Sequence, residues 1–563
     1  MKPGERSPAL TALAGILLVG VLLAGALPFR AYLPFWPMTT DGALWVSRGA
    51  LSSPDWFSWD FLSSHFIGYR PVAAVSFTLD YVLGGFAAWP YRLTSMVLHG
   101  LAGLAVYLAF RSLHGPSGRW AGCLAAAIML AHPVSEEVVP LLARRSYILC
   151  ALFSAAAIPF LVAACRDGRW RSRPALLCAV MVVLAIFSNE EGYVLVVALP
   201  LLALHLRADG ERSWLARLRP AWLVVLGAAL ALLVRLGATQ ELGGYSSNSA
   251  NPAKFWSTTL AALKVFFFPP SEQGKVPWIP GGDATQAVLV AYLLLCCLLV
   301  PAWLLVRARV RGKPHGPAIL PLFLAVWLSG YILLALLTGT WSRRQAYPGL
   351  VPAALLVATL AHQAASRRRL WELVHGPLLA LLLVAMLSHS PSIRGVSARR
   401  VQAAQDQQAR LAIARDLLAE LPVRSMVYLA TSTGPPLRGQ RTKVPNLWYQ
   451  GRRTSAWLST LLQDRKLLIR DVAFLTPKSR KGSGGAVGYE LRDGRPVLVA
   501  GPQTKVTPPK KRFVPELGEE PGGGQVVWLD TVPQQPRRHH YLLYFEGVEQ
   551  RLVCLDEVFD TPR

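Results

Sequence analysis

The stretch AHPVSEEVVPLLARRSYIL, residues 131–149, places a histidine, two glutamates and two arginines between two long apolar runs. Ionisable side chains at membrane depth are costly to bury and are therefore candidates for a functional site. Apolar runs recur from residue 10 to residue 387, and most are near the ~20 residues that a helix needs to cross a bilayer. The sequence therefore predicts an α-helical polytopic membrane protein with this stretch at the end of a span.

We expect about eleven transmembrane helices. Their predicted positions are residues 10–29, 91–110, 120–131, 147–164, 174–187, 192–206, 220–236, 286–306, 318–338, 346–364 and 374–389. The first run follows Lys2 and Arg6, as in a signal peptide, but further spans follow it, so we interpret it as a retained helix. With the N-terminus in the cytoplasm, the cytoplasmic loops are short and rich in arginine, as the positive-inside rule requires. That rule accounts for most of the positive charge of the membrane part, so no nucleic-acid partner is predicted.

The chain is expected to contain two domains. Residues 1–390 form the membrane domain, with a long first outer loop at residues 31–90, and residues 391–563 form a soluble α/β domain on the extracytoplasmic face. The second domain should open with an amphipathic helix at residues 398–421. Strand-like segments then begin at Ser425, Val472, Pro496, Gln525 and His540. The seven cysteines show neither a disulfide framework nor a metal-type spacing.

Five short polar motifs fall on the outer face under this topology. They are TTDG with Asp41, GYRPV with Tyr69 and Arg70, the quoted stretch, SNEE with Glu190, and SRRQAYP with Arg343 and Arg344. Two of the short outer loops carry arginine against the positive-inside rule, which indicates function rather than topology. The simpler interpretation is that each loop lies at the headgroup level with solvated charges. Five such loops on one face favour a functional site.

Local spacing within the quoted stretch suggests a carboxylate–guanidinium pair. Pro133 can begin a helix because its missing N–H costs nothing there, and His132 would then lie at the cap. On a helix, Glu137 would share a face with an arginine seven or eight residues later, Arg144 or Arg145. A glutamate can orient an arginine that binds an anion in bidentate fashion. The proline at position 140 should kink or end this helix near its middle.

The order of these motifs resembles the GT-C superfamily of integral membrane glycosyltransferases, which use polyprenyl-phosphate sugars. The closest likeness is to the bacterial relatives of the tetratricopeptide-repeat transmembrane O-mannosyltransferases, although the repeats themselves are absent. The resemblance covers roughly residues 30–200. It consists of an early loop aspartate, Y-R-P, SFTLD at residues 76–80, Leu98–His99, H-P-V-x-x-E followed by an arginine, and S-x-E. A weaker echo lies at SRRQAYP.

The resemblance implies roles for particular residues. Asp41 would be the catalytic acid or base, with Asp55 and Asp60 as competitors in the same loop; an aspartate there can also act simply as a helix cap. The substrate- and phosphate-binding residues would be Tyr69, Arg70, His132, Glu137, Arg145, Glu190, Arg343 and Arg344. Where the family usually has a lysine this chain has Asn189, so Arg343 or Arg344 is expected to supply that charge.

The implied activity is transfer of a hexosyl group, with mannosyl as the candidate sugar, from a polyprenyl-phosphate donor. The acceptor would be a glycan, a lipid or a protein, at the extracytoplasmic face of a bacterial inner membrane. Guanidinium groups would stabilise the leaving phosphate, and a carboxylate would deprotonate the acceptor. No cofactor or metal is predicted, because the first loop has no D-x-D; a divalent metal held by carboxylates stays open.

Three other functions compete with the glycosyltransferase. A non-enzymatic transporter or lipid-linked glycan flippase should show polar residues at mid-span, broken helices or two similar halves. Here the polar groups gather at one face, which favours the enzyme. A ligase that joins a lipid-linked glycan to another lipid would use similar chemistry. The third alternative is an inert membrane anchor for the C-terminal domain.

Overall fold

The structure is a computed structural model. In the helical part it describes residues 69–169, 171–206, 214–239, 316–337 and 343–366, with shorter pieces at 15–34 and 45–46. Towards the C-terminus it describes residues 412–432 and 467–477, and several segments between 487 and 556. The chain divides into two compact units, of which the first comprises Met1–Leu33 and Ser52–Val396. The second comprises Pro34–Leu51 and Ser397–Arg563.

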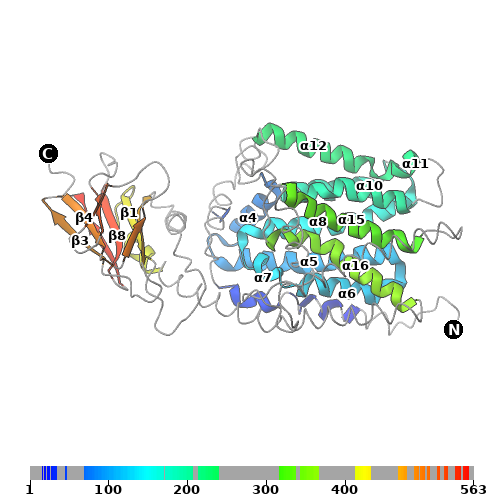
Figure 1. Ribbon diagram of the computed structural model, residues 1–563, viewed down its shortest axis with the longest axis horizontal. Coiled ribbons are helices and arrows are strands. Elements are labelled where there is room, and N and C mark those ends of the chain that lie inside the picture. Colours follow the sequence, from blue (N-terminus) through cyan, green and yellow to red (C-terminus); the bar gives the residue numbers. More distant parts are fainter. Residues whose placement is uncertain are drawn as a thin grey trace. The chain divides into compact units, whose positions relative to one another are not determined.

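The first unit is helical (Figure 1). Its α-helices are α4 (Pro71–Gly84), α5 (Ala88–His114), α6 (Arg119–Ala131), α7 (Ser135–Val138), α8 (Arg145–Asp167), α9 (Arg173–Ser188), α10 (Leu195–Leu206), α11 (Trp214–Leu218), α12 (Trp222–Thr239), α15 (Gly316–Leu337) and α16 (Ala346–Ser366). Short 3-10 turns connect them: η1 (Leu27–Tyr32), η2 (Gly115–Gly118), η3 (Leu142–Arg144), η4 (Glu190–Val194), η5 (Arg219–Ala221) and η7 (Arg343–Gln345).

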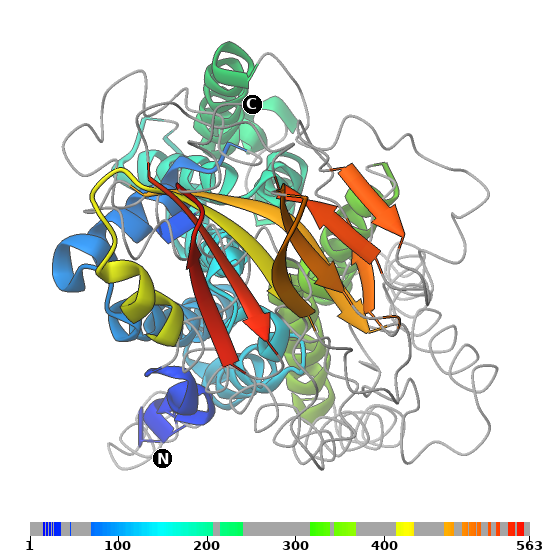
Figure 2. The same ribbon diagram turned by 90° about the vertical axis from the view of Figure 1, so that its left-hand side faces the viewer.

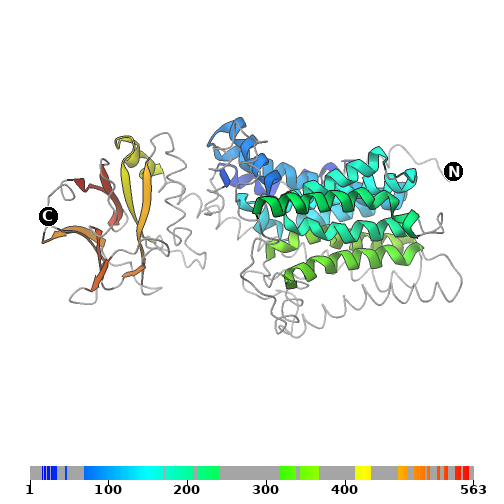
Figure 3. The same cartoon turned by 90° about the horizontal axis from the view of Figure 1, so that it is seen from above.

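Helix α8 forms the centre of this unit. It packs against α5, α9, α16 and α10, and most of its side chains are buried. The helices lie side by side along their length (Figure 3). Helix α8 ends at Gly168, whose φ of 70° is the left-handed conformation that commonly closes a helix. The chain can therefore turn sharply and return as α9, with Ser172 accepting a hydrogen bond from the Ala175 N–H at its N-terminus.

The helical unit has the apolar outer surface of a polytopic membrane protein, the class predicted from the sequence. Three described segments, Ala88–Ala131, Leu142–Asp167 and Leu215–Ala238, are long and apolar enough to cross a membrane by length and composition. Leucines and valines of α5, α9 and α12 point outward, as expected of a surface that faces lipid rather than water. The count of eleven spans stays a prediction, since residues 286–306 and 374–389 lie outside the described residues.

The quoted stretch is broken near its middle, as its proline predicts. Helix α6 ends at Ala131, with His132 at its C-cap, and the next helix, α7, ends at Val138. A turn at Val139 and Pro140 and then η3 lead into α8, which begins at Arg145. A continuous helix with Glu137 and Arg145 on one face is therefore not formed, and that expectation is wrong. Pro140 cannot donate the hydrogen bond that would have continued the helix.

The second unit contains two β-sheets, with strands coloured yellow to red in Figure 2. The strands are β1 (Met426–Ser432), β2 (Leu468–Pro477), β3 (Val487–Arg492), β4 (Arg495–Ala500), β5 (Thr504–Thr507), β6 (Glu516–Glu519), β7 (Gln525–Trp528), β8 (His540–Glu546) and β9 (Glu549–Cys554). One sheet has the order β5-β2-β1-β8-β9 and the other β3-β4-β7-β6. The first is mixed, since β1 runs parallel to β2 and β8, and the second is antiparallel.

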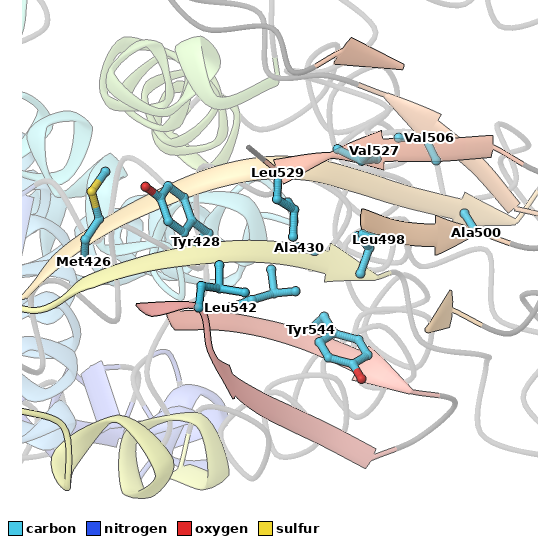
Figure 4. Close-up of a cluster of buried hydrophobic side chains, with 11 residues drawn as sticks. Met426, Tyr428, Ala430, Leu498, Ala500, Val506, Val527, Leu529, Leu542 and Tyr544 are labelled. Atoms are coloured by element: carbon cyan, nitrogen blue, oxygen red, sulfur yellow. The ribbon is translucent and has the colours of Figure 1, made fainter. Parts of the chain in front are cut away.

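One hydrophobic core joins the two sheets (Figure 4). Tyr428 of β1, Leu542 of β8, Leu498 of β4 and Val527 of β7 all take part in it. Every residue of β1 from Met426 to Ala430 is buried, so this strand is covered on both faces. All five predicted strand segments are strands, and residues 412–419 are helical. The extracytoplasmic position of this unit stays a prediction.

Candidate functional site

A buried ion pair joins two of the predicted motifs. Arg70, which precedes α4, contacts Glu190 at the start of η4 through Nη2–Oε1 at 2.8 Å, Nη2–Oε2 at 3.0 Å and Nε–Oε2 at 3.2 Å. Their side chains are 7% and 24% exposed. Burial raises the pKa of the Glu190 carboxyl, but the Arg70 guanidinium outweighs burial and holds it below its ordinary value. The pair is therefore charged at neutral pH.

The first turn of α8 completes the surroundings of Arg70. Its Nη1 donates to Ser146 Oγ at 3.2 Å, and the Asn189 amide donates to the same oxygen at 3.4 Å. The guanidinium also lies over the Tyr147 ring, 5.7 Å from its centroid. Asn189 accepts a hydrogen bond from the Glu191 N–H at 3.1 Å, which caps η4. Residues from α8 and η4 thus fix the Arg70 side chain.

Two further arginines act on this pair or on its neighbours from other elements. Arg235, buried near the end of α12, interacts electrostatically with Tyr69 and Glu190. Arg344 of η7 interacts in the same way with Tyr147 and Glu191. Arg344 is half-buried, and no described residue forms a hydrogen bond or ion pair with it. A half-buried guanidinium with free donors beside other cations is suited to bind an anion.

Glu191 is a second carboxyl group beside the pair. Its side chain is buried, and its Oε2 finds no hydrogen-bond partner among the described residues. Burial and the neighbouring Glu190 raise its pKa well above the ordinary value. Its surroundings thus favour the neutral form of Glu191, whereas Arg70 favours the charged form of Glu190.

Arg145 belongs to a different network from Arg70. Its Nη1 lies 2.6 Å from Asp80 Oδ2, and its Nη2 donates to the Tyr91 carbonyl at 2.6 Å. The hydroxyls of Ser76 and Ser95 accept its remaining hydrogen bonds at 3.2 Å. Of the two arginines that the spacing offered to Glu137, Arg145 is paired with Asp80 instead, while Arg144 lies 3.6 Å from the Glu137 carboxylate.

His132 and Glu137 lie on the turn between α6 and α8 and form local contacts. His132 Nδ1 accepts a hydrogen bond from the Val134 N–H at 3.2 Å. Arg144 Nη1 donates to the Glu137 carbonyl at 2.8 Å and lies 3.6 Å from its carboxylate. Helix α7, which carries Glu137, packs against η7, which carries Arg344. The turn is thus brought beside η7 of the SRRQAYP motif.

Several predicted residues cannot be placed. Asp41 and its competitors Asp55 and Asp60 lie outside the described residues, as does the side chain of Arg343. No group of three or more histidine, cysteine, aspartate or glutamate side chains gathers for a metal within the described part of the chain. The site of a metal that depends on the first loop therefore stays open.

Sequence reasoning missed several contributors to the two networks, among them Arg235, Ser146 and Asp80. Arg235 interrupts an apolar run, and that interruption was the available signal. Ser146 carries no signal, because a serine after two arginines is ordinary. Asp80 stands in the SFTLD motif, but its partner is 65 residues away in the chain (145 − 80), beyond the reach of any local spacing.

Comparison with known proteins supports the resemblance over part of the chain. Residues 70–236 match the family model of dolichyl-phosphate-mannose-protein mannosyltransferases. The protein O-mannosyl-transferase Tmtc2 of Drosophila melanogaster is 32% identical over 105 residues, 18% of this chain and 11% of that protein. The human protein O-mannosyl-transferase TMTC2 is 29% identical over 85 residues, 15% of this chain and 10% of that protein. The predicted resemblance to GT-C glycosyltransferases is thereby confirmed for this segment.

These matches are partial. The chain spans about a tenth of the length of the curated relatives it matches. Among solved structures, ArnT from Cupriavidus metallidurans bound to undecaprenyl phosphate is 13% identical, covers 82% of this chain and 92% of its own, and gives a TM-score of 0.40. That score is too low to support a functional conclusion. The matched segment contains Arg235 and both members of the Arg70–Glu190 pair.

Proposed function

We propose that the protein is a glycosyltransferase that moves a sugar from a polyprenyl-phosphate donor to an acceptor on the extracytoplasmic face of the membrane. One observation supports this most directly. Arg344 is a half-buried arginine without a described ion pair, and it interacts electrostatically with Glu191 and Tyr147, the neighbours of the Arg70–Glu190 pair. A lipid phosphate at the membrane surface is an anion that such a group would bind.

The proposed reaction is a displacement at the anomeric carbon. The acceptor hydroxyl oxygen forms a bond to that carbon while the bond to the phosphate oxygen breaks. The phosphate leaves with the bonding electron pair, and Arg344 and Arg70 stabilise its growing charge. Asp41 takes the proton of the acceptor hydroxyl. Glu190 holds Arg70 in place before the donor arrives, so little reorganisation is required during the reaction.

The remaining predicted residues take supporting roles in this proposal. Arg343 would add charge next to Arg344, and Tyr69, His132 and Glu137 would line the donor site without touching the leaving oxygen. The sugar is a hexose, with mannose as the first candidate, because the matched family model carries that name. The acceptor is a glycan, a lipid or a protein.

The test is transfer from a polyprenyl-phosphate mannose donor by the full-length protein in lipid vesicles. Asp41→Asn should abolish transfer, whereas Asp55→Asn and Asp60→Asn serve as controls in the same loop and should retain it. An intact rate in a correctly inserted Asp41→Asn protein would refute the assignment of the base. Movement of the donor across the vesicle membrane without sugar transfer would instead favour the flippase.

A further inference from the structure

The ion pair of Asp80 and Arg145 is the most deeply buried charge pair among the described residues. The two side chains are 2% and 0% exposed. Every guanidinium nitrogen donates to a protein acceptor: Nη1 to Ser76, Nε to Ser95, and Nη2 to the Tyr91 carbonyl. Nη1 also forms the ion pair with Asp80. A donor phosphate could bind Arg145 only by displacing several of these buried contacts.

Other neighbours close the remaining sides of the pair. The Phe77 ring lies under the guanidinium, 4.2 Å from its carbon, and Thr94 donates to Asp80 Oδ1 at 2.6 Å. A buried charge pair with this many neighbours is costly to open, because breaking it leaves an uncompensated charge. Arg145 is thus committed to the protein interior, unlike Arg344.

The pair also determines where α4 lies. Arg145 and Ser146 are consecutive residues at the start of α8, and each holds α4 at a different point. Arg145 binds Asp80 within the helix, while Ser146 accepts from Arg70 just before it. Tyr69, the residue before Arg70, has a φ of 42°, which a non-glycine residue keeps only when its surroundings impose it.

We propose that Asp80 and Arg145 form a positioning pair, which fixes α4 on the start of α8 and so aims Arg70 at Glu190 without touching the donor. This differs from the role that the family resemblance implies for Arg145, namely phosphate binding. It rests on the proposed function in that Arg70 is taken to bind the donor phosphate.

The test is a double-mutant cycle with undecaprenyl phosphate as the probe. Binding is measured to the full-length protein in nanodiscs. The charge-neutral double variant Asp80→Asn/Arg145→Met retains an acceptor for Thr94 and a side chain of similar length at position 145. With Arg70 present, it should weaken binding about 3- to 100-fold, the range for residues coupled through one network. In an Arg70→Met background the same double variant should have no further effect.

Two results of the cycle would overturn the proposal. An equal loss in both backgrounds would mean that Arg145 binds phosphate itself. No loss in either background would mean that the pair supports only the fold. Should the double variant not fold, Thr94→Val replaces it, because it removes a single hydrogen bond to Asp80. Binding of the probe to Thr94→Val is then measured with Arg70 present and in the Arg70→Met background. Its smaller loss must again disappear when Arg70 is absent, and a loss that persists would overturn the proposal.

A second measurement needs no ligand. Amide hydrogen exchange in Glu190–Val194 should become faster in the double variant, because Glu190 loses a fixed partner. Arg111→Met is the control for loss of an arginine. Arg111 lies in the last turn of α5, away from Thr94 and Ser95 near its start, so this variant should leave the exchange unchanged. Unchanged exchange in the double variant would overturn the positioning role. If the wild-type protein does not bind the probe, the proposed function fails, while hydrogen exchange still decides the role of the pair.

Discussion

Replacing Arg344 by methionine should weaken phosphate binding without destabilising the protein. Arg344 is half-buried and engages no described residue by a hydrogen bond or ion pair, so its removal leaves no described side chain without a partner. A hydrogen bond to a charged group contributes about 1.5–3 kcal/mol. The dissociation constant for a polyprenyl phosphate should therefore rise about 10- to 150-fold. Stability should change by no more than about 0.5 kcal/mol, as for a substitution without buried partners.

Arg70→Met provides the contrast. It removes a comparable phosphate ligand but also leaves Glu190 without its partner. Breaking a buried pair costs about 3–5 kcal/mol, and we expect less here because the Glu190 side chain is 24% exposed. Arg70→Met should therefore reduce both binding and thermal stability, whereas Arg344→Met should reduce binding alone.

Both variants can be measured in one preparation. Undecaprenyl phosphate is titrated into the full-length protein in nanodiscs, and the thermal unfolding of the same samples is recorded without ligand. Equal affinities of the wild-type and Arg344→Met proteins would refute the assignment of Arg344. Destabilisation of Arg344→Met as large as that of Arg70→Met would refute the inference that its guanidinium is unengaged.

Three further predictions concern η4 and the turn before α8. The pKa of Glu191 is raised in the folded protein, so its contribution to stability is present below its unfolded pKa of about 4.3 and declines as pH rises towards the folded pKa. Glu191→Gln should remove that decline in unfolding temperature. Parallel curves of unfolding temperature against pH for the wild-type and Glu191→Gln proteins would contradict this. Gly192→Ala would place a methyl group 2.6 Å from the Ile186 nitrogen and 2.7 Å from the Ala185 carbonyl carbon, so η4 must shift at a cost of about 1–3 kcal/mol. Gly100→Ala, whose added methyl meets nothing within 4 Å, is its control and should be neutral or stabilising in the same thermal scan. Glu137→Gln breaks a partly exposed pair and should cost less than about 1 kcal/mol; a larger loss in thermal unfolding would assign the turn a structural role.

Apolar periodicity and length predicted most of the helical unit, because a helix that faces lipid must be apolar along its own sequence. The run at residues 147–164 became α8, and the run at 174–187 became α9, each within a few residues of its predicted ends. Pro140 predicted the break in the quoted stretch for an equally local reason. In the second unit, β6 was missed because ELGE has no apolar alternation and is held in place by its pairing with β7.

The candidate site was less accessible from the sequence, because its partners are distant in the chain. Arg70 and Glu190 were both singled out, but their contact spans 120 residues. Helix spacing offered Glu137 as the partner of Arg144 or Arg145, because spacing can propose only neighbours within the same helix. Arg144 does lie 3.6 Å from the Glu137 carboxylate, but Arg145 is paired with Asp80. Asp80 was available on another helix, and tertiary packing decided between the two. Asp41 stays a prediction.

The strand order of the mixed sheet sets a limit on when the second unit can fold. Strand β1 receives one parallel neighbour from β2, but the other comes from β8, with Met426 opposite His540. Nearly the whole unit must therefore leave the ribosome before its central strand is covered on both edges. Pairing between such distant segments is slow, and until it occurs β1 presents an open edge to other chains. Newly made chains should thus pass through a period in which chaperones protect this strand.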